Sequence, residues 1–339
     1  MNDSNKKFII STIVIPILTG TLAILVPIIE KQPSFTQSFI IGFLLFFYST
    51  ISCFFVIPFT NKRIIEFLKQ SKVYFYLLIL VIILLPFISW IFVESVKASI
   101  SSFFVWYALP ALMLIFPTFF EDFSFDFILH LFSVILIAIG FDCRYTYDVI
   151  PGIGFQYEIN ALMVSALILV SLSIQIDKFS KKFNWGINKN KLLLPLSLSG
   201  LIAIIAIPIG LVTNFLSWSP KWPGTLMFFF SFLGIWLTVA LPEEIIARGV
   251  FQHQLTERVF SKDSKYFTYW KYGVLIVVSA IFGLSHWNNT TPELAWVYIL
   301  LASIAGTAYG VCWWKGGLFS AMLIHTLVDW IWALIFITP

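Results

Sequence analysis

Long apolar runs alternate with short polar segments along the whole chain. Eleven of these runs have the length of membrane-spanning helices, because an α-helix rises about 1.5 Å per residue and needs about 20 apolar residues to cross a bilayer. Neither the length of the runs nor the short loops between them resembles the strands of a membrane β-barrel. The pattern therefore predicts an all-α, polytopic membrane helix bundle with about 11 transmembrane helices. The predicted spans are approximately 8–29, 38–59, 73–93, 103–119, 125–141, 159–176, 192–216, 225–245, 273–287, 294–313 and 317–337.

Composition supports the same fold class. The chain is 59% hydrophobic and only 11% charged, and its mean hydropathy is +0.93. A soluble domain is about half apolar and a quarter charged, so this chain requires the lipid bilayer as its solvent and partner. The net charge of +4 is small and forms no basic stripe, which argues against nucleic acid as a partner.

Basic residues are distributed unevenly between the two sets of loops. With a cytoplasmic N-terminus, 16 of the 21 Lys and Arg residues lie on the inner side and four on the outer side, and Arg248 remains near the end of a run. This asymmetry follows the positive-inside rule. It predicts a cytoplasmic N-terminus and an external C-terminus. The compact loops and the lack of organelle signals favour the cell (plasma) membrane.

The basic segment 177–191 is the best candidate for a boundary within the chain. The runs before it carry few ionisable residues, whereas the runs after it carry the candidate chemistry. Residues 1–191 are therefore interpreted as an N-terminal transmembrane region of unassigned role. Residues 192–339 are interpreted as the functional part, with the active site between the last four spans.

The first polar cluster within these spans is the segment LPEEIIARG, residues 241–249. On a helix Glu244 and Arg248 are i,i+4 neighbours, so their side chains are expected to meet. Glu243 projects about 100° away from Glu244, because a helix turns once in 3.6 residues. Arg248 is therefore expected to neutralise Glu244 and to leave Glu243 facing a cavity.

Two further clusters lie on the following spans. The segment FGLSHW places Phe282 and His286 on one helix face, and the segment HTLVD places His325 and Asp329 one turn apart. Taken alone, each cluster is open to a structural interpretation as an ion pair or an interhelical hydrogen bond. Ionisable groups inside a bilayer are costly, however, and three helices carry them together. The combination predicts an acid/base site assembled between helices.

The three motifs, EExxxR, FxxxH and HxxxN/D, occur in this order on successive spans, and the set resembles the CPBP family. This family contains the type II CAAX prenyl endopeptidases and the bacteriocin-processing or immunity (Abi-like) proteins, and the resemblance covers about residues 192–337. It implies hydrolysis of a peptide bond in a membrane-associated peptide or protein. It also implies that Glu243 is the general base, that His286 holds the water, and that His325 and Asp329 line the oxyanion side. Glu244, Arg248 and Phe282 would support them.

Asp329 departs from the family pattern, because many members have Asn at this position. An Asn side chain donates a hydrogen bond to an oxyanion, whereas an ionised Asp does not. With neutral histidines, Glu243, Glu244, Asp329 and Arg248 sum to a charge of −2, which is costly in a low dielectric. A shared proton, protonated histidines or a divalent metal would each relieve this charge.

Two mechanisms remain open at this point. In the favoured glutamate-type mechanism no cofactor is needed, whereas in the metal-type mechanism His286, His325 and Glu243 bind Zn²⁺. The sequence lacks the HExxH signature of many zinc proteases. Two other functions also remain open: a proton-coupled transporter, since intramembrane acids mark ion pathways, and a non-catalytic scaffold or immunity protein.

The predicted depths of the site residues do not agree with one another. Counted from the predicted inner boundary, His325 lies about 12 Å deep and His286 about 20 Å deep, whereas Glu243 lies only a few ångströms deep. A longer helix around Glu243, helix tilt or displaced span starts would bring the three residues to one level.

Overall fold

The computed structural model describes residues 35–56, 58–89, 100–120, 126–142, 156–175, 182–183, 189–259 and 262–337. The chain divides into two compact units, Met1–Trp185 and Gly186–Pro339. The boundary expected after residue 191 lies six residues beyond the end of the first unit, and the roles assigned to the two parts stay predictions. The predicted span 8–29 lies outside the described residues.

The first unit is built around helix α9, which is covered on all sides. All fifteen residues from Ile159 to Ser173 are buried, and α3, α5 and α7 pack against this helix. A helix that is apolar all round is expected at the centre of a bundle. The elements of this unit are α3 (Phe35–Val56), α4 (Pro58–Gln70), α5 (Lys72–Ser89), α6 (Ile100–Phe103), η3 (Phe104–Ala108), α7 (Leu109–Ile115), η4 (Phe116–Phe119), α8 (Asp126–Asp142) and α9 (Gln156–Ser173).

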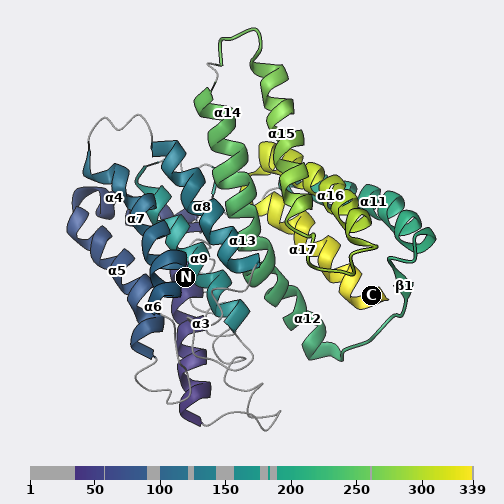
Figure 1. Ribbon diagram of the computed structural model, residues 1–339, viewed down its shortest axis with the longest axis horizontal. Coiled ribbons are helices and arrows are strands. Elements are labelled where there is room, and N and C mark those ends of the chain that lie inside the picture. The colour runs from purple at the N-terminus through teal and green to yellow at the C-terminus, as the bar shows by residue number, and fades with distance from the viewer. Residues whose placement is uncertain are drawn as a thin grey trace. The chain divides into compact units, whose positions relative to one another are not determined.

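The second unit contains all the candidate site residues (Figure 1). Helix α16 packs against α15, α17 and α11, and α17 also packs against the irregular helix that begins at α12. Two short strands, not expected from the sequence, pair in antiparallel fashion with Ser217 opposite Ile337. The elements are α11 (Lys189–Val212), β1 (Ser217–Trp218), α12 (Thr225–Gly234), η6 (Ile235–Ala240), α13 (Leu241–Glu244), η7 (Ile245–Gln252), α14 (His253–Val259), α15 (Phe267–Leu284), α16 (Ala295–Gly316), α17 (Leu318–Ile335) and β2 (Phe336–Ile337).

The predicted all-α, multi-pass fold class is confirmed. Among the described residues, eight helices are long and apolar enough to cross a membrane, or nine if α4 and α5, which meet at 112°, form one span. Helix α8 is a shorter apolar helix. Together with the run at 8–29 these helices account for the eleven predicted spans, and the number that crosses the bilayer stays a prediction.

The span predicted at 225–245 is too short. Helical structure continues for 35 residues over Thr225–Val259, and α15 begins at Phe267 instead of residue 273. Hydropathy did not predict this extension because it detects only the part of a helix that lies in the hydrocarbon core of the bilayer. That core is about 30 Å thick, whereas 35 helical residues extend about 50 Å.

The disagreement in depth disappears with the longer helix. The α14 and α15 helices pack side by side as an antiparallel pair, and a short segment connects them at one end. Glu243 lies 16 residues before Val259, and His286 lies 19 residues after Phe267. Both therefore stand at similar heights above that connection, because each helical residue adds a similar rise.

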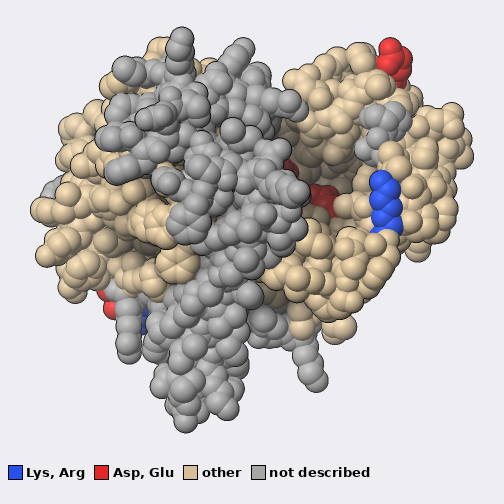
Figure 2. All heavy atoms as spheres, turned by 90° about the horizontal axis from the view of Figure 1, so that it is seen from below, with Lys and Arg blue, Asp and Glu red and all other residues tan. Residues whose placement is uncertain are grey.

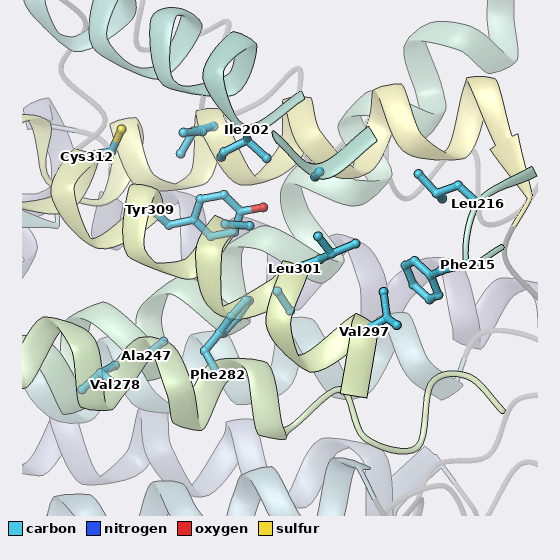
Figure 3. Packing of buried hydrophobic residues seen from close by; sticks show 14 of the residues in the cluster. Ile202, Phe215, Leu216, Ala247, Val278, Phe282, Val297, Leu301, Tyr309 and Cys312 are labelled. Carbon is cyan, nitrogen blue, oxygen red and sulfur yellow. The ribbon is translucent and has the colours of Figure 1, made fainter. Parts of the chain in front are cut away.

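Close packing of α15, α16 and α17 surrounds the site. A Cβ atom on Gly283 of α15 would collide with Ser303 of α16, so this glycine permits the close approach of the two helices. Gly317 has a φ of 70° and links α16 to α17 in a conformation that L side chains rarely adopt. Buried apolar residues of α11, α15, α16 and α17 form a continuous core (Figure 3).

Candidate active site

The paired glutamates lie in an irregular part of the long helix. Only Leu241–Glu244 is α-helical there, and the π-helical segments η6 and η7 precede and follow it. Pro242 has no amide hydrogen and so cannot donate the i→i−4 bond of a regular helix. Such π-helical turns occur frequently at functional sites. The regular α-helix expected through this motif is therefore interrupted on both sides.

The expected contact between Glu244 and Arg248 is present and is part of a longer chain of hydrogen bonds. Both side chains are fully buried, and Arg248 Nε donates to Glu244 Oε2 at 3.1 Å. Arg248 Nη1 donates to Gln252 Oε1 at 3.5 Å, and Gln252 Nε2 donates to the backbone carbonyl of Gly310 at 3.1 Å. The successive i,i+4 contacts hold this face of the helix against α16.

His325 of α17 connects the carboxylates of the site. Its Nδ1 lies 2.9 Å from Glu244 Oε1. Its Nε2 lies 3.3 Å from Asp329 Oδ2 and 3.7 Å from Glu243 Oε2. Glu244 is therefore more than the partner of Arg248: its second oxygen contacts a histidine 81 residues away in the sequence. The residues of the first and third motifs form one cluster.

Charge balance in this cluster favours a doubly protonated His325. Carboxylate oxygens face both ring nitrogens, and an ionised carboxylate only accepts hydrogen bonds. An imidazolium donates from both nitrogens and changes the formal sum of Glu243, Glu244, Asp329, Arg248 and His325 from −2 to −1. Protonated histidine is thus the form of charge relief that this geometry suits best.

Phe282 links the two histidines. Its ring centroid lies 4.9 Å from that of His286 and 5.8 Å from that of His325. The Arg248 guanidinium lies over the same ring at 5.3 Å, a cation–π arrangement. The second motif is therefore in contact with the other two. His286 itself stands in the turn after α15, which ends at Leu284, so the helix ends earlier than predicted, although the two side chains still lie on the same side of it.

Hydrogen bonding defines the chemical state of His286. Its Nδ1 lies 2.8 Å from the backbone carbonyl of Phe282. Because a carbonyl only accepts, Nδ1 carries a hydrogen. In the neutral ring with its hydrogen on Nδ1, Nε2 retains a lone pair, which can accept a proton or a hydrogen bond from water.

Exposure differs between the two glutamates. The Glu243 side chain is 28% exposed and that of Asp329 is 36% exposed, whereas Glu244 is inaccessible. Figure 2 shows acidic atoms set back below the surface of the face that it displays, with a basic side chain beside them. Glu243 and Asp329 are thus the carboxylates that a molecule from outside the bundle can reach.

Four residues that contact the site were not identified from the sequence: Gln252, Tyr309, Gly306 and Gly310. Gln252 and Tyr309 are buried. The Tyr309 ring stacks on His325 with centroids 4.7 Å apart and planes 19° apart. Gln252 could have been found from its spacing, because it follows Arg248 by four residues, just as Arg248 follows Glu244. A single tyrosine in an apolar run carries no comparable signal.

The side chains proposed as zinc ligands are His286, His325 and Glu243. Among the residues that the structure describes, no group of three or more His, Cys, Asp and Glu side chains has an arrangement able to hold a metal ion. His325 also directs both of its nitrogens at carboxylates. His286, His325 and Glu243 are thus not arranged as a metal-binding group in this structure, and metal dependence stays a prediction.

Fold and site together define a multi-pass helical membrane protein with an acid/base cluster inside its C-terminal helices. Residues 225–331 match the family model of the type II CAAX prenyl endopeptidase Rce1-like proteins, and this match supports the resemblance to the CPBP family of intramembrane proteases. All seven site residues named from the three motifs lie inside the matched segment. No curated protein and no solved structure matches the chain significantly.

Proposed function

We propose that the protein is a glutamate-type intramembrane endopeptidase in which Glu243 is the general base. The observation that carries this proposal is the convergence of Glu243, Glu244 and Asp329 on His325. Two helices distant in the sequence bring these groups together inside an apolar bundle. The Rce1-like match independently supports endopeptidase activity in general terms.

Glu243 suits the role of base better than Glu244. Both Glu244 oxygens are occupied, one by Arg248 and one by His325. Glu243 is partly accessible and lies beside His325 Nε2. A general base must reach the water whose proton it removes. Glu244 instead orients His325 and balances Arg248.

The remaining residues divide the reaction between them. Water bound by His286 Nε2 and Glu243 attacks the peptide carbonyl carbon while Glu243 takes its proton. His325 Nε2–H, which faces Asp329 Oδ2 at 3.3 Å without substrate, transfers its hydrogen bond to the oxyanion that develops on the carbonyl oxygen. Glu243 then transfers the proton to the leaving nitrogen as the C–N bond breaks, which yields a carboxylic acid and an amine.

The proposed substrate is a membrane-associated peptide or protein that approaches from the bilayer. A prenylated CAAX tail is one option, and a signal-like peptide or an unprenylated membrane segment is another. The proposed location is the plasma membrane with the N-terminus in the cytoplasm, as the distribution of basic loop residues favours.

A reconstituted cleavage assay tests the function directly. Purified protein in liposomes is offered a farnesylated CAAX peptide, the same peptide without the lipid, and a peptide with a transmembrane anchor. Mass spectrometry then identifies the products. Proteomics of cells with wild-type protein or Glu243→Gln extends the search to native substrates. Uptake of solute into sealed vesicles without any cleavage product would favour a transporter instead.

The substitution Asp329→Asn is expected to retain cleavage within about tenfold. The carboxamide oxygen of Asn still accepts from His325, and its NH₂ group is able to donate to an oxyanion. Asp329→Leu removes the oxygen that accepts from His325 and is expected to lower kcat by about 10- to 100-fold, because a hydrogen bond to a charged group contributes about 1.5–3 kcal/mol. Parallel kcat measurements on the two variants provide the check, and equal losses in both would contradict a hydrogen-bonding role.

Metal chelation is expected to leave activity unchanged. The proposed proton transfers use only Glu243, His286 and His325. Purified enzyme is treated with a strong zinc chelator, dialysed and assayed, and its metal content is measured in parallel. Stoichiometric zinc, together with activity that disappears on chelation and returns with added zinc, would overturn the glutamate-type mechanism.

A further inference from the structure

Helix α16 carries none of the acids, bases or cations of the candidate site, yet it packs against α15, α17 and η7. Its contacts come from Gly306, Tyr309 and Gly310, which lie three and four residues apart and therefore share one helix face. This set is called the α16 platform below. Each of its residues meets a different part of the site.

Tyr309 lies flat against His325. The two rings are close to parallel, and both side chains are almost completely buried. The Phe282 ring stands edge-on to Tyr309 at 6.0 Å and edge-on to His325 at 5.8 Å. Figure 3 shows Phe282 extending from α15 towards Tyr309 on α16. His325 is thereby held in one ring plane while its two nitrogens face the carboxylates.

Gly306 and Gly310 make room for the chain of polar contacts that starts at Glu244. A Cβ atom on residue 306 would stand 3.0 Å from Phe282 Cδ1 and 3.2 Å from Arg248 Nη2. A Cβ atom on residue 310 would stand 2.6 Å from Gln252 Oε1. The Gly310 carbonyl also accepts the hydrogen bond from Gln252. Side chains at these positions would displace groups that orient Glu244 and both histidines.

We propose that the α16 platform positions the catalytic groups, with Tyr309 as the positioning residue of His325. The aromatic face of Tyr309 fixes the imidazole plane and stabilises its positive charge. The two glycines admit Phe282, Arg248 and Gln252 at the required distances. This inference rests on the proposed endopeptidase function for its kinetic test, but its geometric content is independent of that function.

Substitutions at Tyr309 test the stacking contact. Tyr309→Phe retains the ring face and is expected to keep kcat within about threefold of the wild type. Tyr309→Leu removes the face and is expected to lower kcat by about 2- to 30-fold at similar KM, the range that corresponds to a cation–π contact of about 0.5–2 kcal/mol. The control is Tyr48→Leu, a buried tyrosine of the first unit, which should alter stability without altering the kcat of the folded protein.

Glycine substitutions test the platform with a smaller change. Gly306→Ala is expected to lower kcat by at least about fivefold, because Phe282 and Arg248 must shift by a few tenths of an ångström. Gly273→Ala is the matched control, since a Cβ atom there meets nothing within 4 Å. Equal kcat values for these two alanine variants and the wild type would overturn the platform. The comparison of Gly306→Ala with Gly273→Ala still tests the platform if Tyr309→Leu does not fold.

A spectroscopic measurement separates failure of the platform from failure of the proposed function. The chain has four histidines, so ¹⁵N-histidine labelling yields few ring signals, and His325→Gln assigns those of His325. Tyr309→Leu is expected to shift the His325 signals while those of His130, in the first unit, stay in place. Tyr309→Phe is expected to shift them less. A wild type that cleaves nothing would refute the proposed function alone, whereas unchanged His325 signals in Tyr309→Leu would refute the platform alone.

Discussion

The substitution Glu243→Gln is expected to lower kcat by about 10²–10⁴, the range that a general base contributes. Gln keeps the size and polarity of the side chain but has no carboxylate to accept the proton from water. The Glu243 side chain is partly exposed, whereas the fully buried Glu244 holds Arg248. Folding is therefore expected to survive. The measurement is the rate of peptide cleavage in liposomes, with elution volume and Tm in detergent as folding checks.

A matched acidic residue supplies the control for this prediction. Glu293 lies exposed just before α16, and Glu293→Gln makes the same chemical change away from the cluster. Its cleavage rate is expected to remain close to that of the wild type. A Glu243→Gln protein that cleaves at the wild-type rate would remove Glu243 from the mechanism. If such a variant also rescues a deletion phenotype, the scaffold or immunity function becomes the better description.

Substitution of one residue of the buried Glu244–Arg248 pair is expected to lower the stability of the fold, and not only the rate of cleavage. Both side chains are inaccessible, and the pair sits in an apolar bundle. Arg248→Met leaves the Glu244 carboxylate without its cation, and removal of one partner of a buried pair costs roughly 3–5 kcal/mol. The double variant Glu244→Gln with Arg248→Met buries no uncompensated charge, so it is expected to recover part of this loss. Thermal unfolding in detergent compares the variants.

An exposed pair of the same spacing provides the comparison for that experiment. Lys62 and Glu66 of α4 are also i,i+4 neighbours, but their side chains are 77% and 58% exposed and their charges are 3.8 Å apart. Solvent-exposed pairs contribute about 0–1 kcal/mol. Lys62→Met is therefore expected to change Tm little. A loss of Tm in Lys62→Met equal to that in Arg248→Met would contradict the importance of burial.

Local spacing in the sequence was sufficient for the contacts within one helix. Glu244 with Arg248, and His325 with Asp329, meet as i,i+4 geometry requires. The apolar runs likewise predicted the all-α membrane fold, because a chain with so few charges leaves its backbone no solvated alternative to helices in a bilayer. The i,i+4 contacts depend only on the geometry of one helix, and the membrane fold depends on the apolar content of each run. The sequence shows the spacing and the apolar content directly.

The ends of helices were less predictable. Hydropathy ended the 225–245 span too early, although helical structure continues to Val259. It also started the 273–287 span too late, since α15 begins at Phe267. Hydropathy measures preference for hydrocarbon, whereas backbone hydrogen bonds continue a helix past the membrane border. These misplaced helix ends account for the inconsistent predicted depths of Glu243 and His286.

The sequence by itself determined the helical membrane fold and the polar residues that its last spans bring into the bilayer. Only the tertiary structure decided how those residues meet: Glu244 bridges Arg248 and His325, and Tyr309 supports the histidine ring. The physical reason is that an apolar sequence permits a helix to take many rotations about its own axis and many positions along the bilayer normal. Close packing at Gly283, Gly306 and Gly310 selects one of them, and this selection places the carboxylates around a single imidazole.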